Sequence, residues 1–162
     1  MKRIILGISV LISLSSCQQK KEEVKELEIP DLEEQPTLEQ QVADLNANGH
    51  QTFTYKEEDT TYLMQEYYIV FLKSGENRTQ DSLQTAQLQK QHLEHLGRMA
   101  DEGYASLIGP FGDDGEIRGI VVYNTPTMKM ADSLAKLDPM VKAGRLKVEV
   151  HPWWAAKGSK LK

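Results

Sequence analysis

The sequence predicts an α+β fold whose core elements follow the order β-α-β-β-α-β. Two runs, 67–72 and 120–123, are apolar at every position, which is typical of central strands covered on both faces. The run 146–151 alternates apolar and polar residues, and the run 104–108 leads into Gly109-Pro110; both features indicate edge strands. This order predicts a ferredoxin-like fold, a four-stranded antiparallel sheet with two helices on one face.

Two further elements are predicted ahead of this core. Residues 37–48 have the pattern of a short helix, because Thr37 and Gln40 match a capping box and apolar residues recur on one face. The β-rich runs 51–55 and 60–72 flank four charged residues. They predict a hairpin whose second strand continues into the core.

The core helices are predicted at residues 80–103 and 126–137. At about 100° per residue, His92 falls at the flank of the apolar stripe of the longer helix, whereas His95 points nearly opposite the core, into solvent. His92 is therefore expected to be half-buried and His95 exposed. The stripe predicted to be buried consists of Leu83, Ala86, Leu93, Leu96, Gly97 and Ala100.

Two helices can cover only one face of the sheet, so the apolar residues of the other face need a partner. We expect a second copy of the chain there, with two sheets packed face to face in a homodimer. The alternative is that the helix and hairpin of residues 37–62 fold back over that face.

Composition and charge exclude several classes of function. The 162 residues carry 19 basic and 24 acidic side chains, net −5, without the basic excess of a nucleic-acid-binding surface. The single cysteine excludes an internal disulfide and any zinc site built on several cysteines. His92 and His95 are spaced i, i+3, but no third ligand accompanies them, and no phosphate-binding or dinucleotide-binding glycine motif is present. We expect neither a metal nor a cofactor.

The N-terminal residues 1–16 have the pattern of an export signal, with a basic start and an apolar run too short to cross a bilayer. The run ends in Leu14-Ser15-Ser16-Cys17, which resembles the bacterial lipobox. That resemblance implies that Cys17 is lipidated and anchors the protein to a membrane. Residues 17–36 have too few apolar side chains to order and predict an acidic, flexible tether.

These N-terminal features predict a lipoprotein of the bacterial cell envelope. Residue 18 is glutamine and not the aspartate that favours the inner membrane in lipoproteins resembling those of enterobacteria. We therefore expect an outer-membrane protein, on either its periplasmic or its surface side.

Two motifs near the C-terminus allow more than one interpretation. Asp138-Pro139 has the pattern of a helix N-cap followed by proline at the first helical position, so Asp138 is either a cap or a carboxylate that orients a histidine. Trp153-Trp154 follows the last predicted strand, where the rings either line a pocket or pack at the end of the sheet.

Several motifs in register resemble the YciI-like, or YCII-related, domain. They are His92-Leu93, Glu102-Gly103, Gly109-Pro110, the glycine before the strand at Gly119, the segment Asp138-Pro139-Met140-Val141-Lys142-Ala143-Gly144, and a terminal valine-rich strand. The resemblance covers residues 63–154 and leaves 155–162 as a basic tail. It implies a dimeric α+β barrel and a site made of His92 and Asp138. The pocket expected beside this pair has Gly109, Pro110, Met99 and Trp153 as candidate lining residues.

Two classes of function follow from these features. The first is a cofactor-free enzyme, a lyase or isomerase, in which His92 takes a proton from an unknown small molecule and Asp138 orients the imidazole. The alternative is a non-catalytic lipoprotein that binds a small ligand or an envelope partner through the same cleft. The two classes differ in whether His92 and Asp138 meet in an enclosed pocket.

Overall fold

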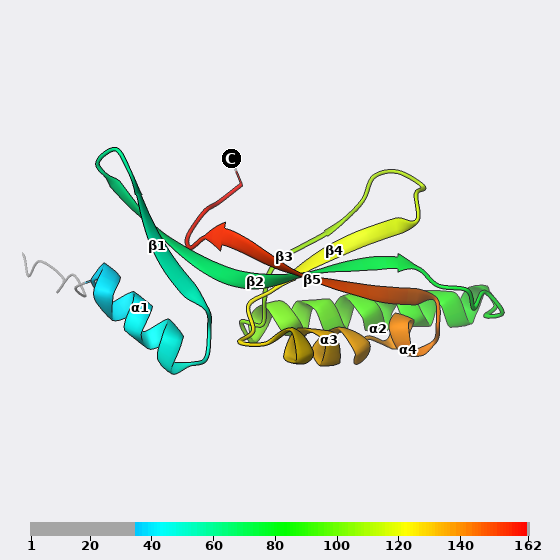
Figure 1. Ribbon diagram of the computed structural model, residues 1–162. Helices are drawn as coiled ribbons and strands as arrows, with labels where there is room; N and C mark the ends of the chain where they lie inside the picture. Colours follow the sequence, from blue (N-terminus) through cyan, green and yellow to red (C-terminus); the bar gives the residue numbers. More distant parts are fainter. Residues whose placement is uncertain (1–34, 162) are drawn as a thin grey trace, which may run out of the picture. The chain divides into compact units, whose positions relative to one another are not determined.

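The computed structural model of the chain describes residues 35–161 (Figure 1). The predicted export signal, the lipidation site Cys17 and nearly all of the predicted tether lie outside the described residues. Among the helices of the described part, none is long and apolar enough to span a membrane.

The sheet is antiparallel and has the predicted ferredoxin-like core. Strands β2 (Thr60–Ser74) and β4 (Ile117–Tyr123) lie at its centre, because β2 pairs with β4 and β5 (Leu146–Ala156), and β4 also pairs with β3 (Ala105–Pro110). The fully apolar runs thus form the central strands, as predicted, and the runs with edge features form the edges. A fifth strand, β1 (Thr52–Glu57), pairs with the N-terminal end of β2.

Three helices cover one face of this sheet (Figure 1). They are α2 (Ser82–Asp101), α3 (Met128–Lys136) and the short α4 (Pro139–Lys142). Helix α1 (Leu38–Ala47) has the predicted capping box of Thr37 and Gln40, contacts β1 and buries none of its own residues. The core between the sheet and the helices is centred on Val70, Val121 and Ala131, each at most 1% exposed.

The predicted buried stripe of α2 was wrong, since Leu96 is its only buried member. Leu83 is 81% exposed and Leu93 is 57% exposed, whereas His95 is only 3% exposed. The helix turns the face of His92, His95, Leu96 and Met99 toward the core. The leucine positions are not decisive, because a buried polar contact with Asp138 compensates the burial of His92.

Strand β5 runs to Ala156, five residues beyond the predicted end at His151. It does so because β2 begins at Thr60 and offers a partner along this whole length, down to the pair Met64 and Ala156. Pro152 is tolerated because β5 is an edge strand, where a missing N–H group costs no ladder hydrogen bond. Trp153 and Trp154 therefore belong to the sheet.

Candidate active site

Helices α2 and α4 bring His92 and Asp138 into direct contact. His92 Nδ1 lies 2.6 Å from Asp138 Oδ2, across 46 residues of sequence. The side chains are 11% and 2% exposed, so the contact is shielded from water. A hydrogen bond of this kind is strong where water is excluded, and it fixes the orientation of the ring.

Asp138 has both of the roles that its sequence context allows. Its Oδ1 accepts a hydrogen bond from the backbone N–H of Met140 at 2.8 Å, which caps α4, while Oδ2 faces His92. Pro139 occupies the first helical turn, and Gly144, at φ +70°, ends the segment in a conformation that favours glycine. The cap thus fixes the carboxylate that meets the imidazole.

This contact determines which nitrogen of His92 is available. With Nδ1–H donated to Asp138, the neutral ring carries its lone pair on Nε2. In the described part of the chain Nε2 has no hydrogen-bond partner, and His92 lines a cavity. The arrangement leaves a basic nitrogen without a protein partner on a residue that lines the cavity.

The cavity beside His92 has a volume of about 480 Å³, which suits a small organic molecule. Of the predicted lining residues, Gly109 and Pro110 contribute to its wall. Met99 is 2% exposed inside the core and Trp153 lines a separate cleft with Tyr67, so the structure does not bring either of them to this cavity. Its apolar wall consists of Leu72, Leu93, Leu96, Ile108, Ile120, Met140 and Leu146.

Comparison with protein families identifies residues 67–154, more than half of the chain, as a YCII-related domain. The chain belongs to the YCII-related family. The match spans the core strands β3 and β4, helices α2 to α4 and most of β2 and β5, so it includes both His92 and Asp138.

A solved structure similar to this YCII-related chain is the 5-chloro-2-hydroxyhydroquinone dehydrochlorinase TftG from Burkholderia phenoliruptrix AC1100, in complex with 2,5-dihydroxybenzoquinone. The two chains share 18% sequence identity, with a TM-score of 0.41. The alignment covers 53% of this chain and 92% of the dehydrochlorinase. A comparison with curated proteins found no match.

His95 of the YCII-related domain is buried, which corrects the prediction that it points into solvent. Arg98 Nη2 lies 3.0 Å from its Nδ1, and its Nε2 is a buried atom without a partner in residues 35–161. Burial lowers the pKa of His95; the negative charge of Asp138 opposes this shift and the positive charge of Arg98 adds to it. His95 is thus held neutral beside the His92–Asp138 pair.

Tyr123 of strand β4 shares this interior. It is 1% exposed, and burial raises the pKa of its phenol, with the charge of Asp138 adding to the rise. Because its phenol stays protonated, Tyr123 is uncharged under all ordinary conditions. His95 and Tyr123 therefore add no charge to the interior around His92 and Asp138.

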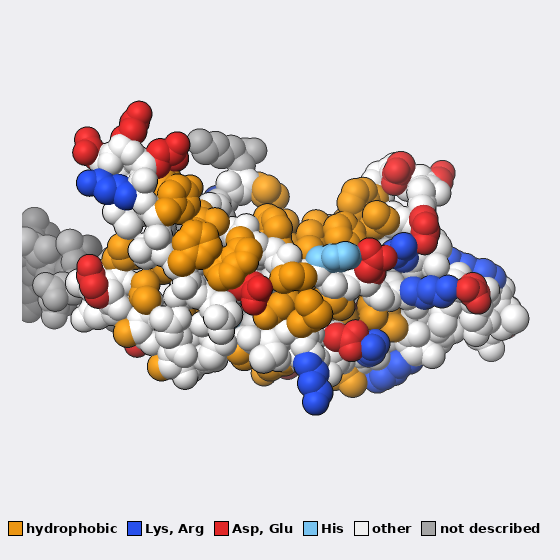
Figure 2. Space-filling view, in the orientation of Figure 1, with side chains coloured by type: hydrophobic (Ala, Val, Ile, Leu, Met, Phe, Trp, Pro, Cys, Tyr) orange, Lys and Arg blue, Asp and Glu red, His pale blue; other side chains and the backbone are white. Residues whose placement is uncertain are grey.

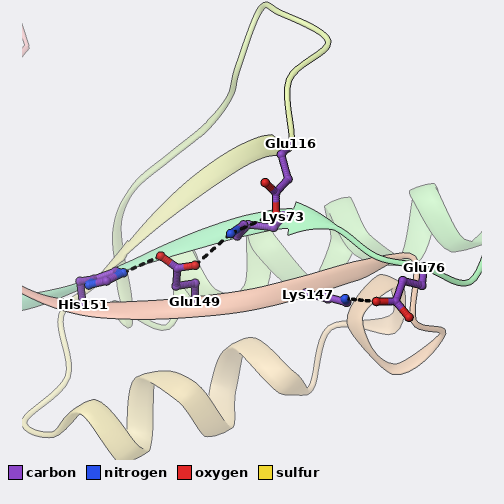
Figure 3. A network of polar contacts seen from close by, with 6 residues as sticks. All are labelled: Lys73, Glu76, Glu116, Lys147, Glu149 and His151. Atoms are coloured by element: carbon purple, nitrogen blue, oxygen red, sulfur yellow. Dashed lines mark hydrogen bonds and ion pairs between the residues drawn. The ribbon is translucent and has the colours of Figure 1, made fainter.

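A second histidine–carboxylate pair lies on the face of the sheet that the helices leave open (Figure 3). His151 Nε2 lies 2.8 Å from Glu149 Oε1, and Lys73 contacts both Glu149 and Glu116. The side chain of His151 is 51% exposed, and the pKa of Glu149 is lowered by its hydrogen bonds to His151 and Lys73. This open network is a surface ion-pair cluster without an enclosed cavity.

Four polar residues of the cavity wall were not predicted. Arg78, Gln89, Arg118 and Arg145 all line it, and they come from four separate parts of the chain. They form no motif in the sequence, because only the folding of the sheet and α2 brings them together. For the described residues, no group of three histidine, cysteine or acidic side chains is placed to hold a metal ion.

Proposed function

We propose that this chain is a membrane-anchored enzyme that transfers a proton on a small molecule, without a cofactor. The observation that carries the proposal is the buried 2.6 Å contact between His92 and Asp138 at the wall of a cavity. An orienting carboxylate on one ring nitrogen and a substrate-sized space at the other are the geometric requirements of a general base.

In the proposed reaction, Nε2 of His92 removes a proton from a carbon next to a carbonyl group, or from a phenol. The electron pair left behind moves into the carbonyl or the ring. For an isomerase, the imidazolium then returns the proton to a different atom; for a lyase, the electron pair expels a leaving group and the proton passes to solvent. Asp138 stabilises the imidazolium in between and keeps its ring in place.

Solvent-deuterium exchange tests this function on a panel of compounds that share an acidic C–H bond. Small ketones, 2-oxo acids and hydroxyquinols are incubated with the protein in D₂O, and exchange at the acidic C–H is followed by NMR. We expect catalysed exchange for a subset of them, and a loss of about 10²- to 10⁴-fold in His92→Gln, the usual contribution of a general base.

The matched control is His151→Gln, which removes the other histidine bonded to a carboxylate, on the open face. It should exchange at the wild-type rate. If the protein binds compounds of this panel but wild type exchanges them no faster than buffer alone does, the non-catalytic ligand-binding lipoprotein is the correct alternative. If His92→Gln exchanges as fast as an active wild type, His92 is not the base.

The anchoring part of the proposal rests on the lipobox pattern that ends at Cys17. In a bacterial host, Cys17→Ser should move the protein from the outer-membrane fraction to the soluble fraction and abolish labelling by a palmitate analogue. Ser16→Ala, which keeps a small residue before the cysteine, should still be labelled. Persistent labelling of the Cys17→Ser protein would contradict lipidation at this residue.

We further propose that the chain forms a homodimer through the open face of its sheet. Along β2, Tyr68, Val70 and Leu72 face the helices, so Ile69 and Phe71 point to the other side. Figure 2 shows hydrophobic side chains gathered over the sheet. Helix α1 packs on β1, so it does not take the place of a partner on this face.

Light scattering on residues 35–162, the compact unit that remains after removal of the N-terminal segment, should give about twice the monomer mass. Phe71→Asp should shift the mass to that of a monomer, because it replaces an apolar ring by a charged side chain in the interface. Leu83→Asp, on the opposite side and already 81% exposed, should stay dimeric. A monomeric wild-type protein would contradict the proposed interface.

A further inference from the structure

The cavity beside His92 concentrates positive charge. Arg78, Arg118 and Arg145 line it, and none of the lining residues within 35–161 is an aspartate or a glutamate. Residues 63–162 carry 13 basic and 12 acidic side chains in all, so three arginines in one cavity are a local excess of positive charge. An apolar cavity with charge of one sign concentrates ligands of the opposite sign.

Arg145 holds the most buried of the three guanidinium groups. Its Nη1 donates to Gln80 Oε1 at 2.9 Å, while its Nε is buried and has no partner in the described part of the chain. A buried donor without an acceptor costs stability, and the guanidinium that carries it lines the cavity, where its remaining N–H groups are placed to meet an anion. No carboxylate of residues 35–161 lies within ion-pair distance of this side chain.

Arg78 and Arg118 stand at the exposed part of the wall. No hydrogen bond or ion pair joins the Arg78 side chain to another described residue. Arg118 Nη1 contacts the carbonyl oxygens of Asp113 and Gly115 at 3.4 and 3.2 Å and forms an exposed ion pair with Asp114 Oδ1 at 3.9 Å, so only the donors on its other nitrogens have no partner in residues 35–161. A guanidinium has five N–H donors, in a planar arrangement that matches a carboxylate.

The apolar remainder of the wall determines which kind of carbon skeleton the cavity can bind. Leucine, isoleucine and methionine side chains make up most of the lining, so a strongly hydrated molecule such as a sugar phosphate would lose its water without replacement. A flat or branched carbon skeleton with one acidic group fits both the apolar wall and the arginines.

We propose that the cavity binds a small organic acid, whose carboxylate is held by Arg145 with Arg78 while its carbon skeleton lies against the apolar wall. This inference deepens the proposed function, on which it rests for the role of His92. Charge that develops on a substrate as His92 removes a proton lies in the same cavity as the guanidinium groups, which stabilise it.

Binding of benzoate tests the ligand class without requiring turnover. Isothermal titration calorimetry of the detergent-solubilised full chain should show saturable benzoate binding, with benzamide at least about tenfold weaker because it lacks the charge. Arg145→Gln and Arg78→Gln should each weaken benzoate binding by about tenfold. Lys129→Gln, which removes a charge from an exposed residue of α3 away from the cavity, should bind as wild type does.

Three results would overturn the assignment: equal affinity for benzoate and benzamide, unchanged benzoate affinity in both arginine variants, or displacement of benzoate by inorganic phosphate at a lower concentration than by acetate. His92→Gln separates this inference from the proposed function. It should retain benzoate binding. If benzoate binding depends on the arginines but no compound exchanges deuterium, the ligand class is supported and the enzyme is rejected. If exchange occurs but is limited to neutral compounds, the enzyme is supported and the ligand class is rejected. Arg78 is exposed, so its variant remains informative even if Arg145→Gln fails to fold.

Discussion

Replacing Asp138 with asparagine should slow the proposed proton transfer by about 10²-fold or more while the domain stays folded. The asparagine side chain keeps an oxygen for the backbone N–H of Met140, so the cap of α4 survives. It removes the negative charge 2.6 Å from His92 Nδ1, so the imidazolium loses its stabilising partner and the ring its fixed tautomer.

Asp138→Ala separates the two roles of this carboxylate. It removes the cap as well, and it leaves His92 without a partner in a site that is almost closed to water. We expect a loss of about 1–3 kcal/mol in the free energy of unfolding, measured by urea denaturation, on top of the loss of exchange. If Asp138→Asn exchanges deuterium at the wild-type rate, Asp138 is a helix cap without a part in the chemistry.

The core of the fold could be predicted because its central strands are distinctive. Runs that are apolar at every position, as in 67–72 and 120–123, are too short for a buried helix and match strands covered on both faces. The Asp138-Pro139 motif likewise fixed the start of α4 through local rules alone. Both features, the central strands and the start of α4, depend on residues that are neighbours in the sequence, so they can be predicted from it.

The face of α2 that is buried against the core could not be predicted in this way. The rule that leucine lies inside placed Leu93 at the centre of the buried face, but His92 and His95 are buried there, with one ring nitrogen of each bonded to Asp138 and to Arg98 respectively. The first of these partners is 46 residues away. The arginines of the cavity could not be predicted either, because they are far apart in the sequence and lie near one another only in the folded chain.

Gly75→Ala should destabilise the domain by about 1–3 kcal/mol or more, as overpacking against backbone does. Gly75 is buried directly after β2, and its N–H donates to the carbonyl oxygen of Arg145 at 2.8 Å. A Cβ at this position would overlap the carbonyl oxygen of Gly144 and lie 2.7 Å from the carbonyl carbon of Arg145. Backbone cannot rotate away as a flexible side chain does, so the two segments must separate.

Gly97→Ala is the matched control for this substitution. Gly97 lies inside α2, is exposed, and has no heavy atom within 4 Å of where a Cβ would stand, so alanine should stabilise the domain by about 0.5–1 kcal/mol. Urea denaturation of residues 35–162, followed by circular dichroism, measures both changes. Equal stabilities for Gly75→Ala and wild type would show that the close approach of β2 to the loop before β5 is not required. Because that loop carries Arg145, Gly75→Ala should also weaken benzoate binding, whereas Gly97→Ala should not.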